Sequence, residues 1–164
     1  MQQFITEYLE GHQKVLAKLE SSAGDIQRAA ERCITALANG HKLLICGNGG
    51  SAADAQHMAA ELVGRFIKDR PALAAIALTT DTSALTAIAN DYGYDEVFSR
   101  QVAGLANAGD VLIAISTSGS SPSVLAACAQ ARALGCEVVG LTGRDGGALK
   151  TCCETAVIAP ADDT

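Results

Sequence analysis

Four polar side chains recur at helical spacing in a segment that is otherwise rich in alanine. Asp54, His57, Glu61 and Arg65 are three or four residues apart, which places them on one stripe of a helix. His57 and Glu61, at positions i and i+4, could share a metal ion or a substrate proton. A solvent-facing stripe without a chemical role is the alternative. The chemical interpretation is favoured because a candidate anion site lies only a few helical turns away.

That candidate anion site is a glycine-rich loop directly before the helix. It comprises Cys46-Gly47-Asn48-Gly49-Gly50-Ser51. Glycines let the backbone approach a ligand closely, and a helix N-terminus favours anions. We expect the helix to begin near Ala52, with Ser51 and Asp54 in capping-box spacing. The loop has neither the dinucleotide motif nor the P-loop lysine, which argues against a dinucleotide or ATP. Taken alone, it could also be a structural tight turn.

A second loop is rich in hydroxyl groups and follows the apolar run Val111–Ile115. Its sequence is Ser116-Thr117-Ser118-Gly119-Ser120-Ser121-Pro122. Pro122 suits the first position of a helix that Ser121 would cap. Ligands of α/β sheets bind at the carboxyl ends of strands, and hydroxyls with backbone amides can hold a phosphate ester without a lysine. The loop therefore predicts a phosphate cradle, with a plain serine-rich turn as the alternative.

A polar segment around Asn90 and Asp91 separates two stretches with helical spacing, Asp81–Ile88 and Asp95–Asn107. Its residue types predict a turn with an Asx cap for the following helix. On its own, this segment is a structural turn rather than a binding site.

The elements that must position these residues begin with two helices over residues 1–40, the second running from beyond Ser21-Ser22 to Asn39-Gly40. Residues 41–164 then alternate short apolar runs with helical segments, which predicts βαβ units. The expected fold class is α/β, a three-layer sandwich with a five-stranded parallel sheet, in a single domain spanning 1–164. The expected strands lie in Lys42–Cys46, Leu73–Leu78, Val111–Ile115, Val138–Leu141 and Thr155–Ala159. The last of them is expected to have no covering helix.

Composition excludes several classes of protein. The 164 residues carry a net charge of −6, are 49% hydrophobic and only 4% aromatic, which fits one packed domain. Without a basic run we expect no nucleic-acid partner, and the apolar runs are far shorter than the ~18 residues of a membrane span. The six cysteines form no C-x-x-C pair, so we expect buried thiols in a reducing compartment. With no signal peptide evident at the start, a cytoplasmic location is predicted.

Together, Cys46–Arg65, Leu78–Val102, Gly109–Val124 and Gly140–Gly147 closely resemble the sugar isomerase (SIS) family, specifically its members that isomerise phosphorylated heptoses. The resemblance covers nearly the whole chain and implies a flavodoxin-like, doubly wound fold in a cytoplasmic homotetramer. The activity it implies converts sedoheptulose 7-phosphate to D-glycero-D-manno-heptose 7-phosphate through an enediol, a step towards the ADP-heptose of lipopolysaccharide core.

The resemblance also implies roles for individual residues. Glu61 corresponds to the catalytic carboxylate, and His57 with Glu61 matches two of the zinc ligands found in many members. Substrate contacts are implied for Asn48, Gly49, Gly50, Ser51, Arg65, Asn90, Asp91, Ser116, Thr117, Ser118 and Ser121. In the family, a helix beyond the Pro-x-x-Asp-Thr segment completes the zinc site and supplies a catalytic acid. This sequence stops at Thr164, so we expect a truncated chain with weak zinc binding and little activity.

Two alternatives within the same fold remain open. One is a non-enzymatic SIS tetramer that binds the replication initiator, and the other is a regulator that senses phosphosugars. The intact Glu61 and the intact hydroxyl loop favour the enzyme over the first alternative. The second usually carries a helix-turn-helix domain, for which 164 residues leave no room.

Overall fold

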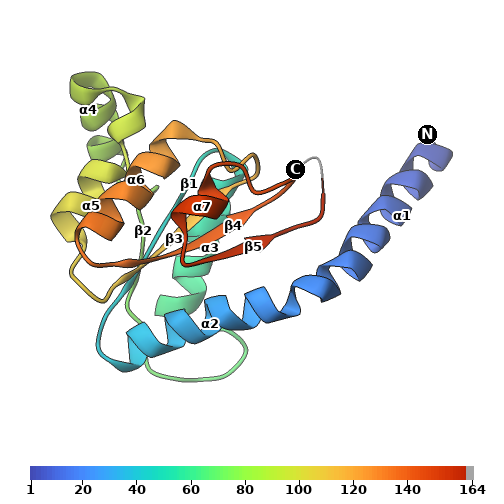
Figure 1. The fold of residues 1–164 in the computed structure, drawn as a ribbon, viewed down its shortest axis with the longest axis horizontal. Helices are drawn as coiled ribbons and strands as arrows, with labels where there is room; N and C mark the ends of the chain where they lie inside the picture. Colours follow the sequence, from blue (N-terminus) through green and yellow to red (C-terminus); the bar gives the residue numbers. More distant parts are fainter. Residues whose placement is uncertain (162–164) are drawn as a thin grey trace.

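Five parallel strands form one sheet at the centre of the computed structural model, which describes residues 1–161 (Figure 1). The order β2-β1-β3-β4-β5 is that of flavodoxin-like doubly wound sheets. Each predicted apolar run overlaps a strand, so the expected five-stranded parallel sheet is confirmed. The bounds are β1 (Leu43–Gly47), β2 (Ala75–Ala77), β3 (Val111–Ser116), β4 (Glu137–Thr142) and β5 (Thr155–Ile158).

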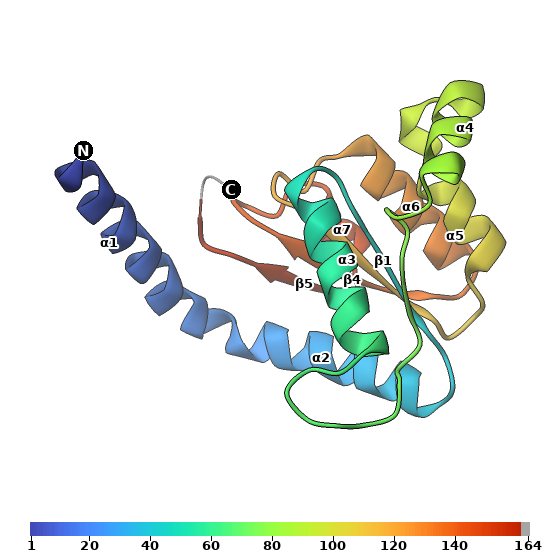
Figure 2. The same ribbon diagram turned by 180° about the vertical axis from the view of Figure 1, so that it is seen from behind.

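Helices cover both faces of the sheet and complete the three layers. Figure 1 looks onto the side of α4 to α7, and Figure 2, turned by 180°, shows α2 and α3 on the other side. The bounds are α1 (Gln2–Leu19), η1 (Glu20–Ser22), α2 (Ala23–Ala38), α3 (Gly50–Val63), α4 (Thr82–Tyr92), η2 (Tyr94–Glu96), α5 (Ser99–Leu105), α6 (Pro122–Ala133) and α7 (Leu149–Cys152).

The central strands are apolar on both sides because each side packs under helices. All residues of β1 and β3 are buried. Successive side chains point to opposite faces, so Leu44 and Leu112 pack in the cluster under α5 and α6, whereas Ile45 and Ile113 pack in the cluster under α2 and α3. Two apolar cores thus hold β1 and β3 rigidly, and these are the strands whose carboxyl ends carry the two candidate loops.

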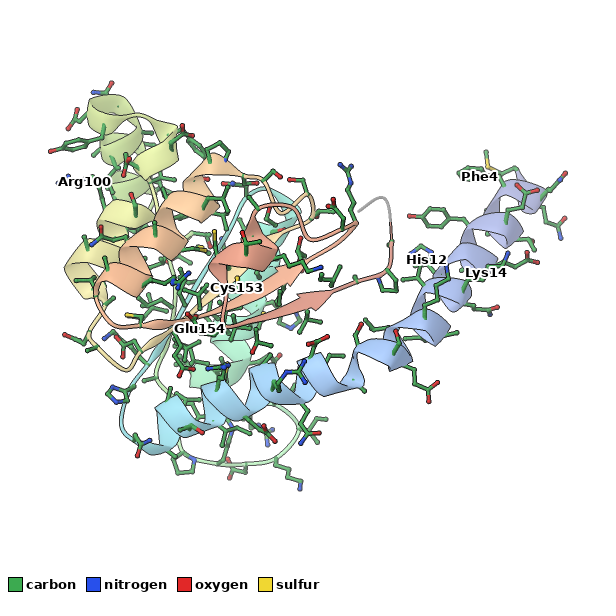
Figure 3. The ribbon with its side chains drawn as sticks, viewed as in Figure 1. Phe4, His12, Lys14, Arg100, Cys153 and Glu154 are labelled. Carbon is green, nitrogen blue, oxygen red and sulfur yellow. The ribbon has the colours of Figure 1, made fainter. Side chains whose placement is uncertain are left out.

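The two N-terminal helices confirm the prediction for residues 1–40. Helix α2 ends at Ala38 with Asn39 as its C-cap, and Gly40 has a φ of +82°, a left-handed conformation that suits glycine after a helix. Helix α1 has no buried residue and projects away from the sheet, as Figure 3 shows through the labelled Phe4, His12 and Lys14. Within residues 1–161 no helix is both long and apolar enough to cross a membrane.

The prediction that β5 has no covering helix is wrong for one face of the sheet. Helix α2 crosses β5, where Val157 packs against the cluster that contains Ala29 and Ala36. Arg32 Nε also donates a hydrogen bond of 2.9 Å to Thr155 Oγ1. The covering helix therefore comes from the start of the chain, a long-range contact that local periodicity does not reveal.

Candidate active site

The glycine loop brings the end of β1 directly against the start of α3. A Cβ on Gly47 would lie 2.7 Å from the Cβ of Ser51, so only glycine permits this approach. Gly49 has a φ of +58° and is the N-cap of α3, which begins at Gly50. The expected start near Ala52 and the capping box of Ser51 with Asp54 are therefore wrong: the glycines turn the chain tightly enough for α3 to begin earlier, and Ser51 lies inside it.

Both polar atoms of the Asn48 side-chain amide form hydrogen bonds. Its Nδ2 donates to Ser123 Oγ at 3.0 Å, and its Oδ1 accepts from the Tyr94 hydroxyl at 2.8 Å. The glycine loop is thereby tied to α6 and to η2. Sequence reasoning did not single out Tyr94 or Ser123, because neither partner is recognisable from local spacing.

The hydroxyl loop and the glycine loop enclose a small polar cavity of about 250 Å³, which we name the hydroxyl cavity. Ser116 ends β3, and Ser121 is the N-cap of α6 with Pro122 at the first helical turn, as predicted. Ser121 Oγ lies 3.1 Å from Ser116 Oγ instead of capping the helix. The cavity is lined by Asn48, Ser51, Ile115, Ser116, Thr117, Ser118, Ser121 and Arg144. Hydroxyls beside a helix N-terminus suit an anion.

Two further cavities continue along α3. An open cleft of about 750 Å³ shares Ser51, Ile115 and Thr117 with the hydroxyl cavity. A smaller apolar cavity of about 350 Å³ shares His57 and Met58 with the cleft, and Glu61 lines it. The three cavities therefore adjoin one another along α3, and we call this row of cavities the trough, with hydroxyls at one end and a carboxylate at the other.

His57 and Glu61 face each other on α3 as the spacing predicts. His57 Nε2 lies 3.2 Å from Glu61 Oε1, and their side chains are 77% and 37% exposed. An imidazole nitrogen and a carboxylate oxygen are both zinc ligands, so the pair fits two positions of a metal site. Within residues 1–161 no group of three or more His, Cys, Asp or Glu side chains could hold a metal ion.

Arg65 does not belong to the predicted stripe. Helix α3 ends at Val63 and has Gly64 as its C-cap, so Arg65 lies outside the helix and is exposed. Asp54, by contrast, lies on α3 and lines the cleft together with His57. The stripe thus shortens to three residues, because the glycine after Val63 ends the helix before Arg65.

Asn90 and Asp91 belong to the last turn of α4, so the expected turn is a helix end. Gly93, with a φ of +94°, is the residue that ends it. Asn90 Nδ2 donates to Asp91 Oδ1 at 2.8 Å, and both side chains are exposed. Neither residue lines the three cavities described above.

The helix expected over residues 95–107 is replaced by two shorter helices, η2 and α5. Figure 3 labels Arg100 of α5, whose guanidinium carbon lies 3.8 Å from the centre of the Tyr92 ring.

Arg144 lines the hydroxyl cavity and was missed by sequence reasoning. It follows β4 in the segment Gly140–Gly147, and Gly143 N donates to Thr117 O at 3.0 Å. The signal that could have found it is the rule used for β1 and β3, that loops at the carboxyl ends of parallel strands bind ligands. The glycine-rich loop after β4 satisfies the same rule.

The cysteines supply no nucleophile to the trough. All six are free thiols, and Cys46, Cys128 and Cys136 are buried as expected, while the other three are partly exposed. Burial raises the pKa of Cys46, which lies under the glycine loop, to about 12. A hydrogen bond with Cys128 lowers the pKa of Cys153, which Figure 3 shows beside Glu154 and away from α1.

Comparison with known proteins places this arrangement in a family. A family model described as "SIS domain" matches residues 7–143. The phosphoheptose isomerase of Aliarcobacter butzleri is 55% identical over 161 residues, which span 98% of this chain and 85% of that protein.

Two solved structures share the fold. The phosphoheptose isomerase of Neisseria gonorrhoeae has a TM-score of 0.93 and 45% identity, over 99% of this chain and 88% of the other. That of Francisella tularensis has a TM-score of 0.94 and 38% identity, over 98% and 86%. The chain therefore belongs to the SIS domain family, and within it to the phosphoheptose isomerases.

Proposed function

We propose that this chain interconverts sedoheptulose 7-phosphate and D-glycero-D-manno-heptose 7-phosphate by aldose–ketose isomerisation. The observation that carries the proposal is the trough of adjoining cavities along α3, with hydroxyls at one end and the His57–Glu61 pair at the other. Ser51 and Glu61 are ten residues apart, about 15 Å along a helix axis. In this proposal the substrate lies along this length of α3, with its phosphate near Ser51 and its C1 and C2 towards Glu61.

The phosphate group occupies the hydroxyl cavity in this proposal. Ser116, Thr117, Ser118 and Ser121 offer hydroxyl donors there, and the N-terminus of α6 adds its dipole. Because Ser116 is buried at the end of β3 and Ser121 is fixed by Pro122, these donors are held before the substrate binds. A preorganised cradle fixes the phosphate at C7 and leaves C1 and C2 towards Glu61.

Glu61 moves the proton between C1 and C2. Its carboxylate takes a proton from C1 of the ketose while O2 gains one from solvent water, which gives the enediol. Return of the proton from Glu61 to C2, with loss of the O1 proton to solvent water, gives the aldose. One carboxylate can perform both transfers, since the proton it removes is the proton it returns. His57, 3.2 Å from Glu61, orients the carboxylate by hydrogen bonding.

His57 and Glu61 would also hold a zinc ion, as part of a site that needs further ligands. A bound zinc ion polarises a carbonyl oxygen and stabilises the negative charge of an enediolate. The two side chains at i and i+4 meet the requirement for neighbouring nitrogen and oxygen donors on one helix face.

The proposal extends to assembly and location. Helix α1 exposes Phe4, Ile5, Tyr8, Leu9 and Leu16, a stripe that fits association into a homotetramer. Six free thiols fit a reducing cytoplasm. Heptose supplied in this way would serve the ADP-heptose of lipopolysaccharide core.

Proton exchange at the substrate tests the reaction. The protein is incubated in D₂O with zinc and sedoheptulose 7-phosphate, and the products are followed by NMR. We expect the aldose phosphate and partial deuteration at C2, because the proton on Glu61 exchanges with solvent. Unphosphorylated sedoheptulose should react far more slowly, since it has no phosphate group to bind in the hydroxyl cavity. Absence of both aldose and deuterium exchange in a folded chain that also carries the family's C-terminal helix would contradict the proposed reaction.

A further inference from the structure

The hydroxyl cavity is lined by several neutral donors but by one cationic residue among those that the structure describes, Arg144. A phosphate ester carries up to two negative charges at neutral pH. The chain as a whole has a net charge of −6, so its long-range field repels such a ligand. A positive charge inside the cavity would offset this repulsion where the anion binds.

Arg144 is presented by a loop that is fastened to the hydroxyl loop. Gly143 N donates to Thr117 O at 3.0 Å, and Leu149 N donates to Gly119 O at 2.8 Å. A Cβ on Gly119 would lie 2.0 Å from Gly146 O, so the two loops touch backbone to backbone. The segment Gly143–Gly147 is therefore a second wall of the cavity, and its position relative to the serines is fixed.

The backbone of Arg144 adopts an unusual conformation. Its φ is +55°, in the left-handed region that favours glycine, and Arg144 N donates to Ala161 O at 2.9 Å. The neighbouring Gly146 and Gly147 also have positive φ values. Glycine would be less strained at this position. A functional role for the side chain would explain why an arginine stands there, since strained residues gather at ligand-binding sites.

We propose that Arg144 is a further phosphate-contacting residue, which adds charge recognition to the neutral hydroxyl loop. Its guanidinium can donate two parallel hydrogen bonds to phosphate oxygens, a geometry that a lysine ammonium lacks. Because the phosphate lies far from C1 and C2, Arg144 contributes equally to binding of the substrate and of the transition state. Its loss therefore raises KM and leaves kcat nearly unchanged.

The decisive variant is Arg144→Gly, because glycine is favoured at this φ and the variant should fold at least as well as the parent. We expect KM for sedoheptulose 7-phosphate to rise tenfold or more, with kcat within about threefold, as for loss of a bidentate charged contact. Arg144→Lys keeps the charge without the fork and should give an intermediate KM. Arg28→Gln removes an equal charge from the exposed side of α2 and should leave KM unchanged.

Binding of inorganic phosphate provides a readout that does not need turnover. Thermal unfolding with increasing phosphate should show a clear stabilisation of the parent and of Arg28→Gln, and a stabilisation that needs at least tenfold more phosphate in Arg144→Gly. Although the inference rests on the proposed function, the two fail separately. A parent without isomerase activity whose phosphate stabilisation still depends on Arg144 overturns only the reaction. Equal KM and equal phosphate dependence in Arg144→Gly and Arg28→Gln overturn the role of Arg144.

Discussion

At the scale of single residues, Glu61 is the side chain whose chemistry the proposed reaction needs most directly. Glu61→Gln keeps the shape and hydrogen-bonding reach of the side chain but removes the base. In a chain that also carries the family's C-terminal helix, we expect kcat for heptose phosphate to fall by ~10²–10⁴ while KM changes little, because loss of a general base affects the transition state alone. Steady-state kinetics with zinc present measures both.

The matched control is Glu31→Gln, the same chemical change on the exposed side of α2, where Glu31 accepts a hydrogen bond from Gln27 at 2.7 Å. It should retain parental kinetics. If Glu61→Gln turned over substrate as fast as Glu31→Gln, Glu61 would be structural and another base would have to act.

Individual residues also mark what a sequence can reveal. The i, i+4 placement of His57 and Glu61 and the Ser121–Pro122 helix start follow from local spacing, and the structure confirms both. The place of Arg144 in the hydroxyl cavity could not be predicted from local spacing, because the cavity forms only where the loops after β3 and β4 meet. The positive φ of Arg144 could not be predicted from the sequence either, because arginine rarely adopts the left-handed conformation.

At the scale of elements, α3 carries both candidate zinc ligands within residues 1–161. Two protein donors are fewer than the three or four of a tight zinc site. The polypeptide 1–164 should therefore bind zinc weakly, and His57→Ala should abolish the binding that remains. Calorimetric titration with zinc checks this, with His12→Ala on exposed α1 as the control. Tight binding that survives His57→Ala would place the metal elsewhere.

Helix α1 leads to an expectation about assembly. Its exposed apolar stripe should be covered by copies of the chain, so we expect association at micromolar concentration. The pair Leu9→Glu with Leu16→Glu should weaken association at least tenfold, because each adds a charge to the stripe. Sedimentation velocity over a dilution series measures this.

The control pair Gln3→Glu with Ala17→Glu adds the same charge to the opposite face of α1 and should leave association intact. A parent that sediments as a monomer at micromolar concentration would refute the role of the stripe.

Element boundaries show where sequence reasoning stops. Apolar runs located all five strands, because a doubly covered parallel strand has no polar side. Helix ends were less accurate: Gly49 and Gly93 moved the start of α3 and the end of α4 through positive φ values. The cover of β5 by α2 joins segments more than a hundred residues apart, which periodicity cannot relate.

At the scale of the whole molecule, Asp110 links the strands that carry the two loops. Burial by itself would raise the pKa of this carboxyl, but hydrogen bonds from Lys42 Nζ at 2.6 Å, Lys42 N and Asn107 N lower it below the ordinary 3.8. His41 Nδ1 also lies 3.9 Å away. Asp110 therefore binds fewer protons in the folded state, and its contribution to stability is present above about pH 4 and lost as pH falls further.

Asp110→Asn tests this contribution. We expect the variant to lose about 2 kcal/mol of unfolding free energy at pH 7, since hydrogen bonds to a charged group are lost. Below pH 4 the difference from the parent should shrink, because the parent carboxyl is protonated there. Urea unfolding at several pH values measures it, with the exposed Asp69→Asn as the control. A pH-independent difference would assign the loss to packing.

Because α1 projects away from the sheet, its helical state receives no support from the packed core. A lone helix of this length, with no buried side chain, is only marginally stable in water. In the proposed assembly, the copies that cover its stripe would support the helical state of α1, so that folding of this segment and association would be one coupled step. Part of the free energy gained at that interface would offset the conformational entropy lost as α1 orders. Affinity between copies would then be lower than the buried area alone suggests, which would keep the assembly reversible.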